Sequence, residues 1–467
     1  MAHILCVTGA ERGLLHASCE LARRLVAAGH RVSLLAPAAA LPVVRAHGLD
    51  AAALGPVMAR GAAPPAERGG GARWLRLAAR RRAALDELGA DDFAAELERS
   101  APDLALIDCE LHEAIVATRS AGIRVAQLCP FVSIWRRPGL PPPHVLALPG
   151  RGLRGSGTGI RLLWTVLRIR RAVRRVRAYA RHAGCDRVSL LRHLALQRGF
   201  AWRREADFAQ WLMPLTWRSL PALVLHAFEL ELPHRPRAGV HYVGPMVAGD
   251  RPTPVEHRLE EARLRALLPA APWRDRQPGS GGDGGARWIY AAFGTHFTAS
   301  PRLLRELIAA VEQRPWWHLV ISLGGAEQES ALGERDATLP PNVHLFPWVP
   351  QPDVLRRVDL AVVHGGSNTA EECVLAGAPM LVYCGGQTDM AGVASRVVFH
   401  GLGALGDAQR DRAPRIGERI EALMEDEDAL GRIETMRSHC LRYAPERVLE
   451  RTVEGLLAAA DGAEGSQ

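Results

Sequence analysis

The sequence predicts an α/β protein with two Rossmann-like domains that face each other across a cleft. The chain of 467 residues is too long for one ordinary core, so two domains of roughly 200 residues each are expected. Short apolar strands alternate with helical segments in both halves, which is typical of doubly wound parallel sheets. Residues 247–286 lie between the halves and are rich in Pro, Gly and charge, as a linker would be.

The N-terminal domain is predicted over residues 1–246. It opens with a βαβ unit whose helix covers residues 19–28 and is expected to end at Gly29. The strands predicted in this domain cover residues 4–7, 31–35, 102–108 and 124–128.

The C-terminal domain is predicted over residues 287–443, where a second α/β pattern follows the linker. Residues 444–467 are expected to form a helix and a tail that can pack back on the N-terminal domain. The strands predicted in the C-terminal domain cover residues 288–293, 318–323, 343–346, 360–363 and 380–383.

Composition excludes several classes of function. All 58 basic residues are arginine, since the chain contains no lysine. A P-loop needs its lysine, as do pyridoxal-phosphate enzymes and Schiff-base aldolases, so these classes are excluded. The N-terminus lacks the pattern of a secretory signal, and no apolar run approaches the roughly 20 residues that span a bilayer. The eight cysteines form no CxxC pair, so we expect a cytoplasmic protein.

A basic amphipathic helix is predicted over residues 160–180. Such a helix can dock on an anionic membrane or on an acidic or lipid-linked acceptor, and it can equally be a solvated helix that covers a sheet. Nucleic acid is not an expected partner, because no recognised module accompanies the charge. The residues assigned to its apolar face are Leu163, Leu167, Ile169, Val173 and Val176.

The stretch from 342 to 397 contains the motifs that indicate chemistry. A buried strand over 360–363 leads into a Gly-Gly turn, after which Ser367 opens a helix that ends at Gly377. A tight glycine turn lets a ligand approach the backbone, and the N–H groups of a helix N-terminus suit a diphosphate. Taken singly, these residues have structural explanations: Thr369, for example, fits a capping box with Glu372, which needs no ligand.

Together, the order and spacing of these motifs resemble the donor-binding signature of family-1 glycosyltransferases, the UDP-glycosyltransferases. The matching segments are WVPQ at 348–351, HGGSNTAEE at 364–372, GAP at 377–379 and ASRV at 394–397. The resemblance implies the GT-B fold with its donor site in the C-terminal domain. The resemblance is strong in that half of the chain and weak between about residues 130 and 240.

The resemblance also implies donor-site roles. Trp348 would stack on the nucleobase, Gln351 and Glu372 would bind ribose hydroxyls, and Asp389 would contact the sugar. No metal and no cofactor are implied, because a helix dipole and hydrogen-bond donors stabilise the diphosphate. The HGGSN form favours UDP over thymidine diphosphate. The residues expected around the diphosphate are Thr295, His364, Gly366, Ser367, Asn368 and Thr369.

The catalytic base departs from the family pattern. The family's histidine falls on Leu14, and the Arg-Gly-Asp form of the glycopeptide and sterol enzymes fails at the same position. We therefore predict a dyad of His16 and Asp108, with Glu11 and His112 as fallback bases.

The acceptor is expected to be a small, hydrophobic molecule bound by the middle of the N-terminal domain. The residues assigned to its pocket are Phe131, Trp135 and His144. The leading hypothesis is an inverting glycosyltransferase, in which a base removes a proton from an acceptor hydroxyl that attacks the anomeric carbon.

Three other functions fit the sequence less well. A non-catalytic partner protein of the same fold is the alternative, because the base position is substituted. A UDP-N-acetylglucosamine 2-epimerase is disfavoured by the motif order. A dinucleotide oxidoreductase is disfavoured by the first turn, which lacks GxGxxG.

Overall fold

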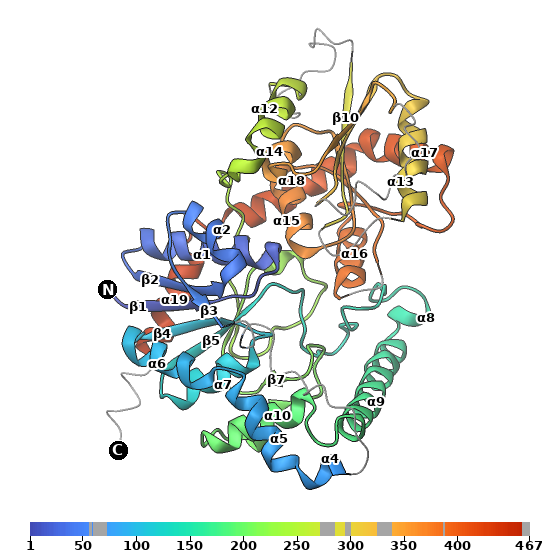
Figure 1. Cartoon of the computed structure of the whole chain (residues 1–467). Helices are drawn as coiled ribbons and strands as arrows, with labels where there is room; N and C mark the ends of the chain where they lie inside the picture. Colours follow the sequence, from blue (N-terminus) through green and yellow to red (C-terminus); the bar gives the residue numbers. More distant parts are fainter. Residues whose placement is uncertain are drawn as a thin grey trace.

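The computed structural model describes residues 1–55, 58, 72–270, 285–294, 300–324, 339–385 and 388–459, without the side chains of 12, 72 and 73. It contains two parallel sheets, each covered by helices, with one sheet above the other in Figure 1. The predicted α/β class with two Rossmann-like domains is confirmed. All eight cysteines are free thiols.

The N-terminal sheet has seven parallel strands in the order β3-β2-β1-β4-β5-β8-β9. Its strand order reverses between β1 and β4, so a crevice opens at their carboxyl ends. The strands are β1 (His3–Val7), β2 (Arg31–Pro37), β3 (Asp50–Leu54), β4 (Leu104–Asp108), β5 (Arg124–Cys129), β8 (Ala222–Val224) and β9 (Val240–Tyr242). A small hairpin joins β6 (Ala206–Asp207) to β7 (Thr216–Trp217).

Helices cover both faces of this sheet and continue into a helical lobe below it (Figure 1). Strand β4 is buried along its whole length, as expected of a parallel strand between two helix layers. The helices are α1 (Arg12–Ala27), α2 (Leu41–Ala46), α4 (Ala72–Leu75), α5 (Leu77–Asp86), α6 (Ala90–Ser100), α7 (His112–Ser120), α8 (Gly152–Gly155), α9 (Gly157–Arg181), α10 (Arg187–Gln197) and α11 (Trp202–Glu205), with 3₁₀ turns η1 (Ala38–Ala40) and η2 (Phe228–Leu230).

The C-terminal sheet has six parallel strands in the order β12-β11-β10-β13-β14-β15. The reversal here lies between β10 and β13. The strands are β10 (Arg287–Ala292), β11 (Trp317–Ser322), β12 (Val343–Phe346), β13 (Leu360–Val363), β14 (Met380–Val382) and β15 (Gly403–Leu405). The helices are α13 (Pro301–Glu312), α14 (Gln351–Leu355), α15 (Ser367–Ala376), α16 (Met390–Phe399), α17 (Ala413–Glu425) and α18 (Glu427–Leu441).

The segment between the sheets contains structure of its own. The 3₁₀ turn η3 (Val255–His257) and helix α12 (Arg258–Leu267) precede residues 271–284, which lie outside the described part of the chain. Leu264 and Leu268 pack into the same core cluster as Trp288 of β10. Helix α12 therefore belongs with the C-terminal sheet.

The last helix, α19 (Val448–Ala458), lies against the N-terminal domain, beside α1 in Figure 1. Its residues Leu449 and Val453 are buried in the core cluster that contains Leu21. Arg124 Nη1 donates to the Leu457 carbonyl oxygen at 2.6 Å. The chain thus returns to the first domain after completing the second.

Polar contacts cross between the domains. Ser367 Oγ donates to the Pro130 carbonyl at 2.8 Å, and Ala147 N donates to Ser395 Oγ at 3.2 Å. Glu231 forms a buried ion pair with Arg396 of α16. Although burial alone would raise it, the charges of Arg396 and His226 hold the pKa of Glu231 well below its usual value. These contacts bring the carboxyl ends of the two sheets together.

Candidate active site

A cavity of about 670 Å³ lies between the two domains. Its walls come from the segments that follow β1, β4 and β5 on one side and β10, β13 and β14 on the other. Both walls are therefore formed at the carboxyl ends of strands, beside the points where strand order reverses. Open parallel sheets bind their ligands at such points.

The turn after β13 forms the C-terminal wall. Gly365 has a φ of +88°, which favours glycine, and Gly366 precedes the first residue of α15. A Cβ at Gly366 would lie 2.7 Å from Nε2 of His364, and one at Gly294 would lie 2.9 Å from its Cε1. His364 is thus held between two glycines. Burial lowers its pKa to about 4, so the ring is neutral beside the N-terminus of α15.

The N-terminus of α1 meets this turn from the other domain. A Cβ at Gly13 would lie 2.7 Å from Nδ2 of Asn368, so any larger residue there would displace the end of the Asn368 side chain. Ser367, Asn368 and Thr369 all line the cavity. Thr295 lies outside the described residues.

A hydrogen-bond network connects four side chains at one end of the cavity. Gln351 Nε2 donates to Glu372 Oε2 at 2.5 Å and to Thr369 Oγ1 at 3.3 Å. Tyr290 donates its hydroxyl to Gln351 Oε1 at 2.9 Å. Arg251 Nη2 donates to Glu372 Oε1 at 2.6 Å. The structure brings Gln351 and Glu372 together as predicted partners of one site and adds Tyr290 and Arg251, which no sequence motif indicated.

Trp348 is half-buried and lines the same end of the cavity. His257 of η3 stacks on its indole, with ring centroids 5.2 Å apart and an interplanar angle of 3°. A flat aromatic surface therefore stands next to the Gln351–Glu372 network.

Asp389 immediately precedes the first residue of α16, is buried and lines the cavity. Its Oδ2 accepts a hydrogen bond from the backbone N–H of Val132, in the other domain, at 3.3 Å. Burial raises its pKa. Asp389 therefore lies where the two walls meet.

The predicted acceptor residues are divided by the structure. Phe131 lines the cavity and packs edge-on against Trp211, with centroids 5.6 Å apart. Trp135 lies behind this wall, in an apolar cluster with Trp164. His144 is half-buried and accepts a hydrogen bond from Trp211 Nε1 at 3.2 Å. Trp211, which the sequence analysis did not single out, therefore lines the cavity in front of Trp135.

His16 lines the cavity from within α1. Because this helix begins at Arg12, Leu14 and His16 point in directions about 200° apart. The imidazole of His16 packs edge-on against that of His47, with centroids 5.7 Å apart.

Asp108 ends β4 and is buried. Its Oδ1 accepts a hydrogen bond from the backbone N–H of Glu110 at 2.9 Å. A Cβ at Gly9 would lie 3.2 Å from Asp108 Oδ2 and 2.5 Å from Glu11 Oε2, so two carboxyl groups flank this glycine. Burial, followed by the charges of Glu110 and Glu11, raises the pKa of Asp108 to about 8. A pairing of Asp108 with His16 stays a prediction.

Of the two fallback bases, Glu11 lines the cavity, together with Glu110. Burial and the charge of Glu11 raise the pKa of Glu110 to about 7. His112 lies in the core, where it donates to the Met213 carbonyl at 3.3 Å and packs edge-on against Trp217. Burial lowers its pKa to about 4. The structure thus places Glu11 at the site and His112 inside the N-terminal domain.

Comparison with known proteins agrees with this geometry. The family model described as UDP-glucoronosyl and UDP-glucosyl transferase matches residues 284–398. Oleandomycin glycosyltransferase of Streptomyces antibioticus is 27% identical over 470 residues, which cover 98% of this chain and 91% of that protein. Demethyllactenocin mycarosyltransferase of Streptomyces fradiae is 30% identical over 175 residues, which cover 37% of this chain and 36% of that protein.

Two solved structures share the fold over nearly the whole chain. The glycotransferase of kitacinnamycin has a TM-score of 0.64 at 21% identity, covering 99% of this chain and 98% of its own. The calicheamicin glycosyltransferase CalG4 has a TM-score of 0.58 at 19% identity, covering 98% of each chain. With two facing sheets around the cavity, the chain has the GT-B fold of these structures. Its donor-signature half matches the UDP-glucoronosyl and UDP-glucosyl transferase family, and the whole chain is similar to glycosyltransferases.

Proposed function

We propose that the protein is an inverting glycosyltransferase that moves a sugar from a nucleoside diphosphate to a hydroxyl of a small, lipophilic natural product. One observation supports this above all: a single cavity joins a glycine turn and helix N-terminus on one wall to Phe131 and Trp211 on the other. Relatives named for oleandomycin and kitacinnamycin point to the same class of acceptor.

The donor would lie along the C-terminal wall. Trp348 would stack on the nucleobase, Gln351 and Glu372 would bind ribose hydroxyls, and Asp389 would contact the sugar. The sequence favours UDP, whereas the related fold of VinC was solved in complex with dTDP, so we propose that the nucleotide is one of these two. The residues assigned to the diphosphate are His364, Gly366, Ser367, Asn368 and Thr369.

In the proposed reaction, a base accepts the proton of the acceptor hydroxyl while its oxygen bonds to the anomeric carbon. The bond from that carbon to the diphosphate oxygen breaks, and the nucleoside diphosphate leaves with the electron pair. N–H groups at the start of α15 stabilise the charge that develops on it. We assign the base to His16, oriented by Asp108, because His16 lines the cavity near the family position. Glu11 and Glu110 lie on the same wall and are the alternatives.

A non-catalytic partner protein is the competing function, and Leu14 at the family's base position is the observation that favours it. One experiment separates the two. The protein is incubated with UDP-glucose or dTDP-glucose and a panel of lipophilic hydroxylated acceptors, and products are identified by mass spectrometry. We expect an acceptor mass increased by one sugar. Nucleotide binding without transfer to any acceptor would favour the partner protein.

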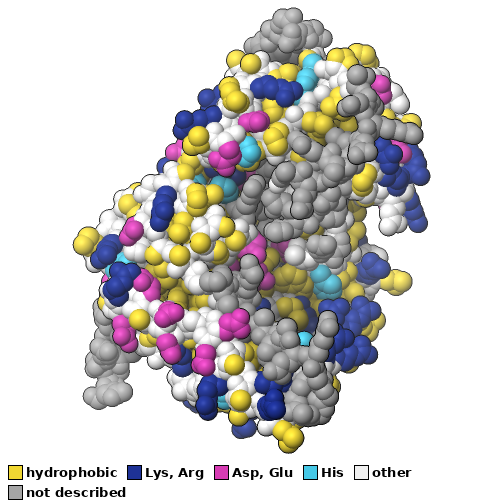
Figure 2. Space-filling view, in the orientation of Figure 1, with side chains coloured by type: hydrophobic (Ala, Val, Ile, Leu, Met, Phe, Trp, Pro, Cys, Tyr) yellow, Lys and Arg dark blue, Asp and Glu magenta, His cyan; other side chains and the backbone are white. Residues whose placement is uncertain are grey.

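We also propose a peripheral membrane contact through α9. The predicted apolar face proves to be divided, because Leu163 and Leu167 are half-buried whereas Ile169 and Val176 are 59% and 69% exposed. The apolar residues of this helix that are fully buried, Ile160 and Trp164, lie outside the predicted face. The helix contains eight arginines and no acidic residue. Figure 2 shows dark-blue and yellow side chains together over α8 and α9 at the lower right.

Exposed apolar residues flanked by arginines suit an anionic bilayer surface. In the described part of the chain, no helix is long and apolar enough to cross a membrane. We expect sedimentation with vesicles that contain anionic lipid and weaker sedimentation of Ile169→Ser/Val176→Ser. Equal recovery of both proteins in the supernatant would contradict the contact.

A further inference from the structure

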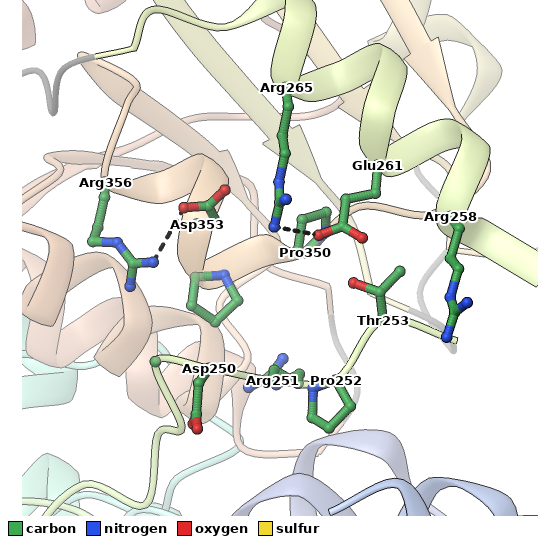
Figure 3. Close-up of a pocket in the computed structure, with 12 residues that line it drawn as sticks. Asp250, Arg251, Pro252, Thr253, Arg258, Glu261, Arg265, Pro350, Asp353 and Arg356 are labelled. Carbon is green, nitrogen blue, oxygen red and sulfur yellow. Dashed lines mark hydrogen bonds and ion pairs between the residues drawn. The ribbon is translucent and has the colours of Figure 1, made fainter. Parts of the chain in front are cut away.

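Arg251 lies at the junction of the two domains and of two cavities. It lines the cavity described above and also a neighbouring cavity of about 500 Å³, shown in Figure 3. The adjacent Asp250 pairs with Arg23 of α1 at 2.7 Å, whereas Arg251 pairs with Glu372 of α15 at 2.6 Å. Two consecutive residues of the connecting segment therefore contact opposite domains.

The contact with Glu372 leaves room for a ligand. One oxygen of Glu372 accepts from Arg251 and the other from Gln351. A carboxylate offers about four acceptor positions, so each oxygen can still accept a ribose hydroxyl. Arg251 thus holds the Glu372 carboxylate in place and leaves acceptor positions on it for a ligand.

The guanidinium of Arg251 also has donor capacity that the protein does not use. Its side chain is 15% exposed, and its Nε is buried without a hydrogen-bond partner among the described residues. Buried N–H groups are costly to leave unpaired. The side chain is partly exposed and lines the cavity, so the remaining N–H groups of its guanidinium can donate to a polar group of a ligand.

Charge gives an independent argument. Among the described residues that line the cavity, Arg251 is the only arginine, and lysine is absent from the chain. Burial raises the pKa of Glu371 and of Asp389, which reduces their negative charge, yet neither supplies a positive one. A nucleoside diphosphate is strongly anionic, so a cation on the cavity wall adds to the stabilisation that the N-terminus of α15 provides. The carboxyl groups that face it are Glu11, Glu110, Glu371, Glu372 and Asp389.

We infer that Arg251 is a donor-binding residue contributed by the connecting segment: it holds Glu372 for the ribose and attracts the diphosphate with its guanidinium. The inference rests on the proposed function and extends the donor site beyond the C-terminal domain. Arg251 also connects donor binding to the position of the N-terminal domain, because the adjacent Asp250 is paired with Arg23 of α1.

The test compares Arg251→Leu and Arg251→Gln with Arg258→Leu. Arg258 is an exposed arginine of α12 that lines the neighbouring cavity (Figure 3), so its removal changes the net charge equally. Calorimetry measures the affinity of each protein for UDP and dTDP, and for uridine and thymidine, which lack the phosphates. Thermal melting shows whether each variant is folded.

We expect both Arg251 variants to bind the nucleoside diphosphates about 10- to 100-fold more weakly, as for a lost charged hydrogen bond. Binding of the nucleosides should weaken less, and Arg258→Leu should change neither affinity more than about twofold. Unchanged diphosphate affinity with a lower melting temperature would make Arg251 a structural contact and overturn the inference. Equal losses for nucleoside and diphosphate would overturn the role of its charge. If the wild-type protein binds no nucleotide, the proposed function fails and this inference with it.

Discussion

The two walls of the cavity differ in how far apart their residues lie in the sequence. The C-terminal wall is built mainly from one continuous stretch of chain between Trp348 and Asp389, in which strand, glycine turn and helix follow one another. The N-terminal wall combines residues separated by about two hundred positions, from Glu11 to Trp211. Motifs therefore describe the first wall well. The chemistry of the second depends on which distant side chains the fold brings together.

The largest expected effect concerns the catalytic base, which we assign to the N-terminal wall. We expect His16→Ala to lower turnover at least about 100-fold, the lower range for loss of a general base. Glu11→Gln and Glu110→Gln are the matched variants, since both residues line the same wall. Near-wild-type turnover of His16→Ala, with a large loss in either glutamine variant, would move the role to a carboxylate. If all three retain activity, the proton goes elsewhere.

Glu372→Ala tests the assignment of donor binding to the C-terminal wall. Its carboxylate accepts from two side chains and is buried, and we propose that it also accepts ribose hydroxyls. Calorimetry should show UDP or dTDP binding weakened by about 1.5–3 kcal/mol, the range for a charged hydrogen bond. Glu312→Ala, at an exposed end of α13, serves as the control. Unchanged affinity for both nucleotides would contradict the assignment.

The buried carboxyl on the N-terminal wall predicts a pH effect on stability. The pKa of Asp108, about 8, lies above the ordinary value of about 4, so the folded state binds this proton more tightly than the unfolded chain. The contribution of Asp108 to the free energy of unfolding is therefore present below about pH 4 and is lost as pH rises toward 8. The melting temperature of Asp108→Asn should fall less between pH 5 and pH 8 than that of the wild type. Parallel pH profiles would argue against a protonated Asp108.

The smallest expected effect concerns metal ions. Because the N-terminus of α15 and its side chains can stabilise the diphosphate, we expect EDTA to leave the rate unchanged within about twofold. The measurement is product formation with EDTA and then with added magnesium or manganese. Activity that disappeared with EDTA and returned with either ion would require a different account of the donor wall.

The same contrast shows how much of the site could be predicted. Gln351 and Glu372 meet at one end of the cavity, as the family resemblance implied. They are 21 positions apart, and the strand, turn and helix between them are local structures. Trp211 could not be predicted, since it reaches the cavity from a segment where the family resemblance is thin. Glu110 was overlooked, although its position two residues after Asp108 at a strand end was a usable signal. Arg251 carried no signal, because its partner is 121 positions away in the sequence.

By itself, the sequence determined the alternation of strands and helices, the two sheets and the donor motif, because apolar periodicity and glycine turns act over a few residues. Tertiary structure alone decided that α1 approaches Asn368 at Gly13, that α19 returns to the first domain, and that α9 keeps an apolar side exposed. Those outcomes depend on long-range packing, where burial and charge are set by neighbours distant in the chain. The same reason separates Asp108, whose pKa is raised by its surroundings, from an ordinary exposed aspartate.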